Sequence, residues 1–287
     1  MKILRYKIET LIVKLLFFVL KKISIDKSSE ICGKIAKLIG PILSINNIAH
    51  KNIDLVFPDI DKIGKQKIIN EMWENLGRVI GEFPHIYNIT QEDFLSRVKI
   101  NGIEHIENLT KNVIFFSGHL ANWEVSPRIP RIKGMELALI YRTANNQAVD
   151  KIISNERVKN GINLISKGKG GIKALLRALK NKLNLAMLVD QKMNDGIEVP
   201  FFGKNAMTAP AIVKLAAEYD MPIIPAQVIR TKGAYFEVNI SQPIIVDKSD
   251  SNYVYNNMLI INKMLEKWII ENPGQWFWLH KRWPKIY

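Results

Sequence analysis

Residues 112–124 read NVIFFSGHLANWE: an apolar run passes into a Ser-Gly pair and a histidine, and a glutamate follows five positions later. Aromatic and β-branched residues ahead of Ser117 and Gly118 are typical of a strand that ends in a turn. From about residue 100 onward, short apolar runs of this kind alternate with helix-like segments. We therefore predict an α/β fold with a central mixed, largely parallel sheet flanked by helices.

The predicted elements cover this alternating region and two helices that precede it. Strands are expected at 112–117, 136–141, 184–190, 221–229 and 234–241, and helices at 28–43, 66–83, 121–129, 145–159, 171–182, 208–219 and 254–271. Ligands of such sheets bind beyond the carboxyl ends of the strands. His119 follows the predicted strand at 112–117 and Asp190 ends the predicted strand at 184–190, which allows both to face one crevice.

The composition is that of a folded protein with a strongly basic balance. Hydrophobic residues make up 47% and charged residues 24% of the 287 positions, which argues against wholesale disorder. A formal net charge of +14 attracts nucleic acid, anionic lipid or an acidic protein. Cys32 is the only cysteine, so an intramolecular disulfide and a cysteine zinc site are excluded. The histidines show no H-x-H or H-E-x-x-H spacing, so the sequence does not support a metal site.

The N-terminal segment is apolar but too short to cross a bilayer. Residues 8–20, IETLIVKLLFFVL, fall short of the ~20 apolar residues of a spanning helix, and no small-residue cleavage site follows. Lys7, Lys14 and Lys21 recur every seven residues, which puts them on nearly one line of a helix. The pattern favours a helix within residues 1–24 that lies in a membrane interface. An amphipathic helix docked on the protein's own core is the alternative.

His119 and Glu124 are a candidate general-base pair. Five residues of α-helix turn about 500°, so the two side chains meet only if His119 lies in the loop and Glu124 in the first helical turn. The carboxylate would then bind one imidazole nitrogen and leave the other free as a general base. The chain has no G-x-S-x-G elbow, so the attacking oxygen would come from a substrate hydroxyl or water. From the spacing alone, a well-packed corner explains the pair equally well.

Other motifs carry candidate binding chemistry. Arg142 follows a predicted strand, where a guanidinium suits a phosphate or carboxylate and a surface arginine fits as well. Asp190 with Gln191 is suited to orient a polar substrate or to form a turn. The KGKGG run at 167–171 precedes a helix and reads as an anion site or a solvated turn. The run QWFWLHKRWP at 275–284 suits base stacking or a membrane interface, but closure of the core with a basic rim is favoured.

In their order along the chain, these motifs resemble those of a known family. They are KNIDLVFP at 51–58, GHLANWE at 118–124, YR at 141–142, DQ at 190–191, VPFFGKNAMTAPAIVKLA at 199–216, PIIP at 222–225 and NPGQWFWLHKRWP at 272–284. The series is similar to that of the late (secondary) acyltransferases of lipid A biosynthesis, the lauroyl and myristoyl transferases of the lysophospholipid-acyltransferase-like superfamily. The resemblance implies an acyltransferase domain at 25–287 behind a membrane-associated helix at 1–24.

The resemblance also implies a reaction, in which a fatty acyl group passes from acyl carrier protein to a hydroxyl of a lipid A precursor. His119 would deprotonate that hydroxyl, and Glu124 would orient the imidazole. Arg142 would hold an anionic group of the substrate, while Asp190 and Gln191 would shape the acceptor site. No metal and no cofactor are implied besides acyl-acyl carrier protein, which is the donor substrate. The implied location is the cytoplasmic face of the inner membrane.

The chemistry of the residues agrees with this implication. A thioester is already activated, so the protein needs a base and oxyanion stabilisation but no covalent nucleophile. The positive charge suits three partners: acidic acyl carrier protein, a phosphorylated glycolipid acceptor and a membrane surface. The alternative is an acyltransferase with another membrane lipid acceptor, such as a lysophospholipid or glycolipid. A nucleic-acid-binding protein or an inactive scaffold would leave the ordered motifs unexplained.

Overall fold

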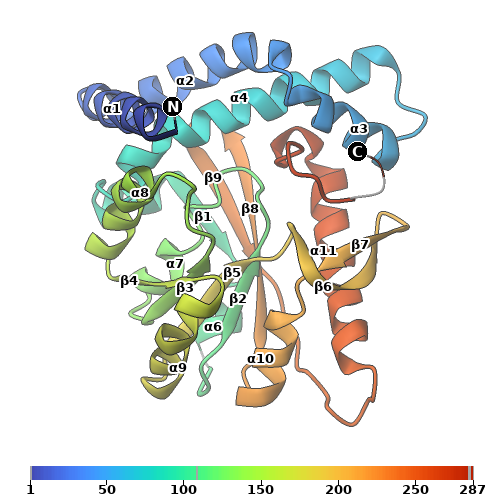
Figure 1. Cartoon of the computed structure of the whole chain (residues 1–287). Coiled ribbons are helices and arrows are strands. Elements are labelled where there is room, and N and C mark those ends of the chain that lie inside the picture. Colours follow the sequence, from blue (N-terminus) through green and yellow to red (C-terminus); the bar gives the residue numbers. More distant parts are fainter. Residues whose placement is uncertain (1, 108, 284–285, 287) are drawn as a thin grey trace.

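The computed structural model describes residues 2–107, 109–283 and 286, and a seven-stranded sheet lies at the centre of this part of the chain (Figure 1). Its strands are β1 (Val98–Asn101), β2 (Ile114–Ser117), β3 (Leu137–Tyr141), β4 (Ile162–Ser166), β5 (Asn184–Leu188), β8 (Ile223–Lys232) and β9 (Tyr235–Ile240). They run in the order β1-β9-β8-β2-β5-β3-β4. All neighbours pair in parallel except β8 with β9, which are antiparallel. The predicted α/β class with a mixed, largely parallel sheet is confirmed.

Helices surround this sheet, and a separate antiparallel hairpin is formed by β6 (Lys192–Phe201) and β7 (Lys204–Thr208). The helices are α1 (Lys2–Leu20), α2 (Ile25–Ile39), α3 (Asn46–Val56), α4 (Lys62–Ile86), α5 (Gln91–Arg97), α6 (Glu104–Glu107), α7 (Arg128–Ile132), α8 (Gln147–Lys159), α9 (Ile172–Lys180), α10 (Ala211–Tyr219) and α11 (Tyr253–Glu271). Short 3-10 turns lie at Gly40–Ile42, Lys169–Gly171 and Pro273–Gln275. In Figure 1, α1, α2 and α4 form a layer across one end of the sheet.

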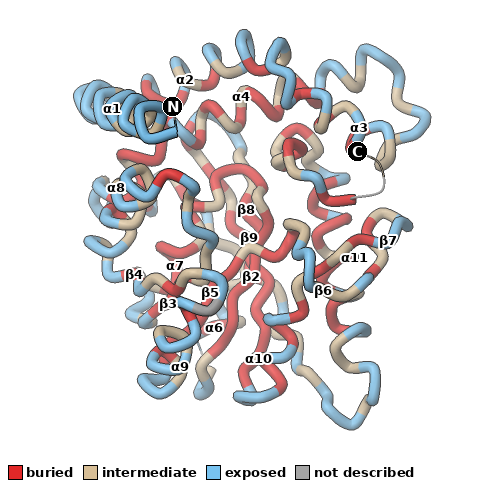
Figure 2. Tube along the Cα trace, in the orientation of Figure 1, coloured by how far each residue is buried: buried red, intermediate tan, exposed pale blue. Residues whose placement is uncertain are grey.

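The side chains of the sheet alternate between two hydrophobic cores, one on each face. In β2, Ile114 and Phe116 belong to one core and Phe115 to the other, as expected for a strand buried on both sides. The long helix α4 reaches both cores, with Met72 in the first and Phe83 in the second. Figure 2 shows the central strands buried, whereas α1 and α9 expose much of their surface.

The segment after β2 departs from the prediction of a helix at 121–129. Only its end is helical, because α7 begins at Arg128. Ala121 has a φ of +47°, outside the helical region, and the Asn122 side-chain oxygen accepts a hydrogen bond from the Glu124 N–H at 3.0 Å. Glu124 therefore lies in a tight turn and not in the first turn of a helix.

The other predicted elements overlap helices or strands of the structure, which also contains elements that the sequence analysis did not predict. These are α3, α5, α6, β1, β4, β6 and β7. Most are short, so each offers few residues for an apolar period to be recognised. Pairing with a neighbour, and not local pattern, makes β1 and β4 the two edges of the sheet.

Helix α1 is attached to the protein by polar contacts and by Phe17, which packs against the second core and stacks on Phe83 of α4, so the alternative of docking on the core is met in part. The helix also turns apolar residues outward. The Asn146 side chain, which caps α8, donates to the Tyr6 carbonyl at 2.9 Å, and Lys21 Nζ lies 3.0 Å from Glu156 Oε1. Most of the large apolar side chains of α1 are exposed: Ile3, Leu4, Ile8, Leu11, Ile12, Leu15, Phe18 and Val19. By length and hydropathy, none of the described helices qualifies as a membrane span. Association of α1 with a membrane surface therefore stays a prediction.

Candidate active site

His119 and Asp190 lie together at the carboxyl ends of two neighbouring parallel strands. The register of β2 and β5 sets Ser117 beside Leu188, so the residues two positions further on are also neighbours. His119 Nδ1 lies 2.7 Å from Asp190 Oδ1, and the His119 backbone N–H donates to Asp190 Oδ2 at 2.6 Å. The two residues are thus in direct contact, but only His119 lines the cavity described below, since Asp190 is buried behind it.

The surroundings of Asp190 decide which imidazole nitrogen carries the proton. Asp190 is 1% exposed, and Trp276 Nε1 donates to its Oδ2 at 2.8 Å. Burial favours the protonated acid, but the His119 charge and these hydrogen bonds hold the pKa of Asp190 well below its usual value. An ionised carboxylate only accepts hydrogen bonds, so Nδ1 of His119 is the protonated nitrogen. The other nitrogen, Nε2, is then unprotonated, and it accepts a long hydrogen bond from the Gln191 side-chain amide at 3.4 Å.

Glu124 has partners other than the expected His119, because Asp190 takes the place that the sequence analysis gave to Glu124. Tyr87 Oη donates to Glu124 Oε2 at 2.6 Å, and Arg157 donates through Nε to Oε2 at 3.0 Å and through Nη2 to Oε1 at 2.5 Å. Burial raises the pKa of Glu124, but the Arg157 charge and these hydrogen bonds outweigh burial and lower it. The turn at Asn122 directs the carboxylate toward α4 and α8, where these partners lie.

His119 and Glu124 both line a cavity of about 600 Å³, within the ~300–1,000 Å³ typical of ligand pockets. The wall of this cavity on the sheet side is apolar and comes from four strands; it includes Phe115, Leu137, Leu139, Ala186 and Ala226. Pro127 and Pro130, before and within α7, line it as well. The cavity thus combines one long apolar wall with a polar end at His119.

The polar end of the cavity also contains the predicted cation Arg142. Arg142 and Lys167 follow the neighbouring strands β3 and β4, and both line the cavity together with Gln191. Arg157 is a third cation in the lining, but its guanidinium is engaged by Glu124. Lys167 of the 167–171 run thus lies in the cavity lining, and anion binding there stays a prediction, whereas Asp190 contacts His119 and does not line the cavity.

The C-terminal tryptophans close the core, as the sequence analysis favoured, but Arg282 is buried with them and does not belong to the basic rim that was expected. Trp276, Trp278 and Trp283 are at most 2% exposed, and Arg282 is fully buried. Phe277 remains at the cavity, where its ring centroid lies 6.1 Å from that of His119. One of these tryptophans also belongs to the site, because the Trp276 indole donates a hydrogen bond to the Asp190 carboxylate.

Three residues of the site escaped the sequence analysis: Tyr87, Arg157 and Trp276. Each contacts a partner more than thirty positions away, at 37, 33 and 86 residues respectively. A local spacing rule gives no signal for such pairs. Arg157 was contained in the predicted helix at 145–159, but nothing in that helix pointed to Glu124.

The chain matches a known protein family over almost its whole length. The model of the bacterial lipid A biosynthesis acyltransferase family matches residues 1–285. The chain belongs to this family. Its members transfer acyl groups in lipid A biosynthesis, and the resemblance of the ordered motifs is confirmed.

Curated relatives agree on the chemistry at low identity. A lipid A biosynthesis acyltransferase of Haemophilus influenzae is 22% identical over 82% of this chain and 76% of its own length. The palmitoleoyltransferase of Escherichia coli is also 22% identical, over 82% of this chain and 78% of its own, and the lauroyltransferase of the same organism is 20% identical over the same shares. Among solved structures, the 1-acyl-sn-glycerophosphate acyltransferase PlsC from Thermotoga maritima aligns over 91% of this chain and 97% of its own, with 14% identity and a TM-score of 0.37.

Proposed function

We propose that this lipid A acyltransferase moves a fatty acyl chain from acyl carrier protein to a hydroxyl of a lipid A precursor, with His119 as general base. The observation that carries the proposal is the pairing of His119 Nδ1 with the buried Asp190, which leaves Nε2 unprotonated in the lining of the cavity, where an acceptor hydroxyl would replace the long contact with the Gln191 amide. Membership of the family supports acyl transfer in lipid A biosynthesis.

The base acts on the acceptor and not on a residue of the chain. His119 Nε2 takes the proton of the acceptor hydroxyl while its oxygen attacks the thioester carbonyl. The tetrahedral intermediate then expels the thiolate of the carrier's prosthetic group, which takes up the proton from the imidazolium. The ionised Asp190 stabilises the positive imidazole between these two steps.

The cavity suits the two substrates at its two ends. The apolar wall across β2, β3, β5 and β8 is placed to bury the acyl chain, which gains about 0.8 kcal/mol per buried methylene. Arg142 and Lys167 at the polar end are placed to hold a phosphate of either substrate. Glu124, fixed by Arg157, would shape this polar end, and Gln191 would contact the acceptor.

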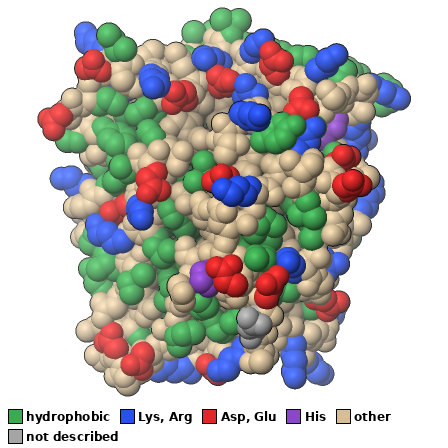
Figure 3. All heavy atoms as spheres, turned by 180° about the vertical axis from the view of Figure 1, so that it is seen from behind, with side chains coloured by type: hydrophobic (Ala, Val, Ile, Leu, Met, Phe, Trp, Pro, Cys, Tyr) green, Lys and Arg blue, Asp and Glu red, His purple; other side chains and the backbone are tan. Residues whose placement is uncertain are grey.

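Acyl carrier protein is the proposed protein partner because it is acidic and this chain carries a net charge of +14. On the face shown in Figure 3, Lys and Arg side chains are interspersed with acidic ones, so the charge is not gathered there in one block. Arg142 and Lys167 line the same cavity as His119, so the surface around these two cations is the expected docking region, since the thioester must reach His119.

The apolar outer side of α1 supports a place at the cytoplasmic face of the inner membrane. Its exposed residues include Leu11, Leu15 and Phe18, with Lys7 and Lys14 also exposed on the same helix. Such a helix binds an anionic lipid surface through buried apolar area and charge attraction. This orientation would bring an amphiphilic acceptor close to the protein without a spanning segment.

The test is an in vitro transfer assay with acyl-acyl carrier protein, a defined lipid A precursor and a lysophospholipid as competing acceptor. We expect the precursor to be acylated, His119→Ala to lose at least about 10³-fold in kcat, and Asp190→Asn to lose about 10²–10⁴-fold, since the histidine loses its orienting anion. Arg177→Ala, an exposed change in α9, serves as the control. Full activity of His119→Ala would refute the base, and transfer to the lysophospholipid alone would assign the other acceptor class.

A further inference from the structure

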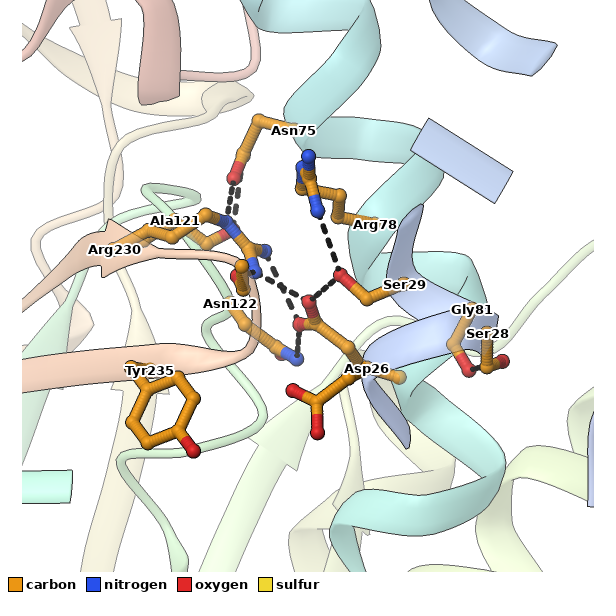
Figure 4. A network of polar contacts seen from close by, with 12 residues as sticks. Asp26, Ser28, Ser29, Asn75, Arg78, Gly81, Ala121, Asn122, Arg230 and Tyr235 are labelled. Atoms are coloured by element: carbon orange, nitrogen blue, oxygen red, sulfur yellow. Dashed lines mark hydrogen bonds and ion pairs between the residues drawn. The ribbon is translucent and has the colours of Figure 1, made fainter. Parts of the chain in front are cut away.

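A buried polar network joins the turn that carries His119 and Glu124 to α4 and to the β8–β9 hairpin (Figure 4). Its centre is Glu82 of α4, whose side chain is 0% exposed. Asn122 Nδ2 donates to Glu82 Oε2 at 2.8 Å, and Ser29 Oγ of α2 donates to Oε1 at 2.6 Å. The Arg230 guanidinium binds both carboxylate oxygens. The carboxylate is thus held by side chains from three other segments.

Asn122 is the member of this network that belongs to the catalytic turn. It is fully buried, and its second amide atom, Oδ1, accepts the Glu124 backbone N–H at 3.0 Å. The side chain therefore bridges the backbone of Glu124 to the carboxylate of Glu82. Only a side chain of this length with both a donor and an acceptor completes the bridge.

The residue before Asn122 is held in a conformation that needs such support. Ala121 has a φ of +47°, which residues other than glycine adopt rarely. Its N–H donates to the Gln275 carbonyl at 2.9 Å, and its carbonyl accepts from Asn75 Nδ2 at 3.0 Å. Asn75 Oδ1 in turn accepts from Arg230 Nε at 2.9 Å, so the same network holds both residues of the turn.

Stability alone does not explain this arrangement, because a buried ion pair replaced by well-packed apolar side chains often leaves a protein equally or more stable. A network in which each amide and carboxylate has a directed partner fixes geometry instead. The network holds Ala121 and Asn122, and His119 lies two residues before Ala121 while Glu124 lies two residues after Asn122. The geometry that the network fixes is therefore that of the turn between His119 and Glu124.

We propose that Asn122 is a positioning residue: through Glu82 it fixes the turn so that His119 and Glu124 both reach the cavity. The inference rests on the proposed role of His119 as the base. A shift of the imidazole by one ångström is enough to cost about 10²-fold in rate, since the acceptor oxygen must meet Nε2 at hydrogen-bond distance.

The first test compares Asn122→Ala with the matched variant Ser29→Ala in the transfer assay. Each variant removes a buried hydrogen bond to the Glu82 carboxylate. Only Asn122→Ala removes hydrogen bonds that hold the turn between His119 and Glu124. We expect Asn122→Ala to lower kcat by about 10²-fold with KM changed by less than about threefold, and Ser29→Ala to stay within about threefold of wild type. The thermal midpoints of both variants are measured alongside. Wild-type kcat in Asn122→Ala, or an equal loss in Ser29→Ala, would overturn the proposal.

A second test stays informative even if Asn122→Ala does not fold. Asn122→Asp keeps the acceptor for the Glu124 N–H but sets a second carboxylate against Glu82, so kcat should fall. Adding Glu82→Gln restores one donor and one acceptor between the two positions with almost no change in volume. We expect the double variant to recover kcat by at least about tenfold over Asn122→Asp. A double variant no better than Asn122→Asp would contradict the bridge.

His119→Ala separates this inference from the proposed function. If His119→Ala keeps its activity, His119 is not the general base, and Asn122 then has no base to position. If His119→Ala is inactive while Asn122→Ala keeps wild-type kcat, the base assignment stands and only the positioning role is wrong.

Discussion

The Asp190 carboxylate receives hydrogen bonds from the His119 ring, the His119 backbone and the Trp276 indole, and this set leaves Nε2 as the unprotonated imidazole nitrogen. The sequence placed His119 and Asp190 correctly at strand ends but paired the histidine with Glu124. The contact joins residues 71 positions apart and depends on the β2–β5 register, which no local spacing reveals. The Glu124 carboxylate instead accepts hydrogen bonds from Arg157 and Tyr87.

Two buried serines allow a hydroxyl without a partner to be compared with one that has a partner. Ser117 Oγ has no hydrogen-bond partner among the described residues, whereas Ser28 Oγ donates to the Gly81 carbonyl at 2.5 Å. We expect Ser117→Ala to change the free energy of unfolding by less than about 0.5 kcal/mol, and Ser28→Ala to lower it by about 1 kcal/mol. Urea unfolding measures both. Equal losses in the two variants would show that Ser117 has a partner in solution.

At the scale of elements, α8 connects the site to the N-terminal helix. Arg157 near its end holds Glu124, while Asn146 before its first turn and Glu156 near its end hold α1. The sequence analysis predicted a helix at 145–159, and the observed helix covers Gln147–Lys159. Its three partners were not predictable, because they come from elements distant along the chain.

The cavity wall gives a prediction about the acyl chain. Ala186 of β5 lines the cavity, whereas Ala138 of the neighbouring strand β3 is buried in the core on the opposite face. Ala186→Leu fills part of the cavity, so we expect kcat/KM to shift by about tenfold toward a shorter acyl donor. Ala138→Leu adds the same atoms elsewhere and should lower stability without changing this preference. Competition between donors of two lengths measures the ratio, and an unchanged preference in Ala186→Leu would place the acyl chain outside this cavity.

At the scale of the whole molecule, burial of histidines makes stability depend on pH. Burial lowers the pKa of His280 to about 4 from 6.5, and it also lowers the pKa values of His50 and His85. Because the folded pKa lies below the unfolded one, the unfolded chain binds more protons between these values. The contribution to stability is therefore complete above pH 6.5 and is lost as the pH falls toward 4.

We expect the urea midpoint to fall on acidification across this range, and His280→Gln to weaken that dependence. Near neutral pH the variant should be less stable, since His280 Nε2 accepts the Lys192 backbone N–H at 2.6 Å. The control is His105→Gln, because the His105 side chain is partly exposed beside Glu104 and away from this contact. Parallel pH curves for wild type and His280→Gln would show that His280 is not buried in neutral form.

The sequence by itself determined the alternation of strands and helices, the strand ends that carry His119 and Asp190, and the family. These follow from apolar periodicity, turn residues and ordered motifs, all of which are local properties of the chain. Only the tertiary structure decided that Asp190 and not Glu124 supports the histidine, that Arg157 holds Glu124, and that α1 turns its apolar side outward. The physical reason is that strand register, helix packing and directed hydrogen bonds join residues far apart in sequence, and their geometry exists only once the sheet and its helices are assembled.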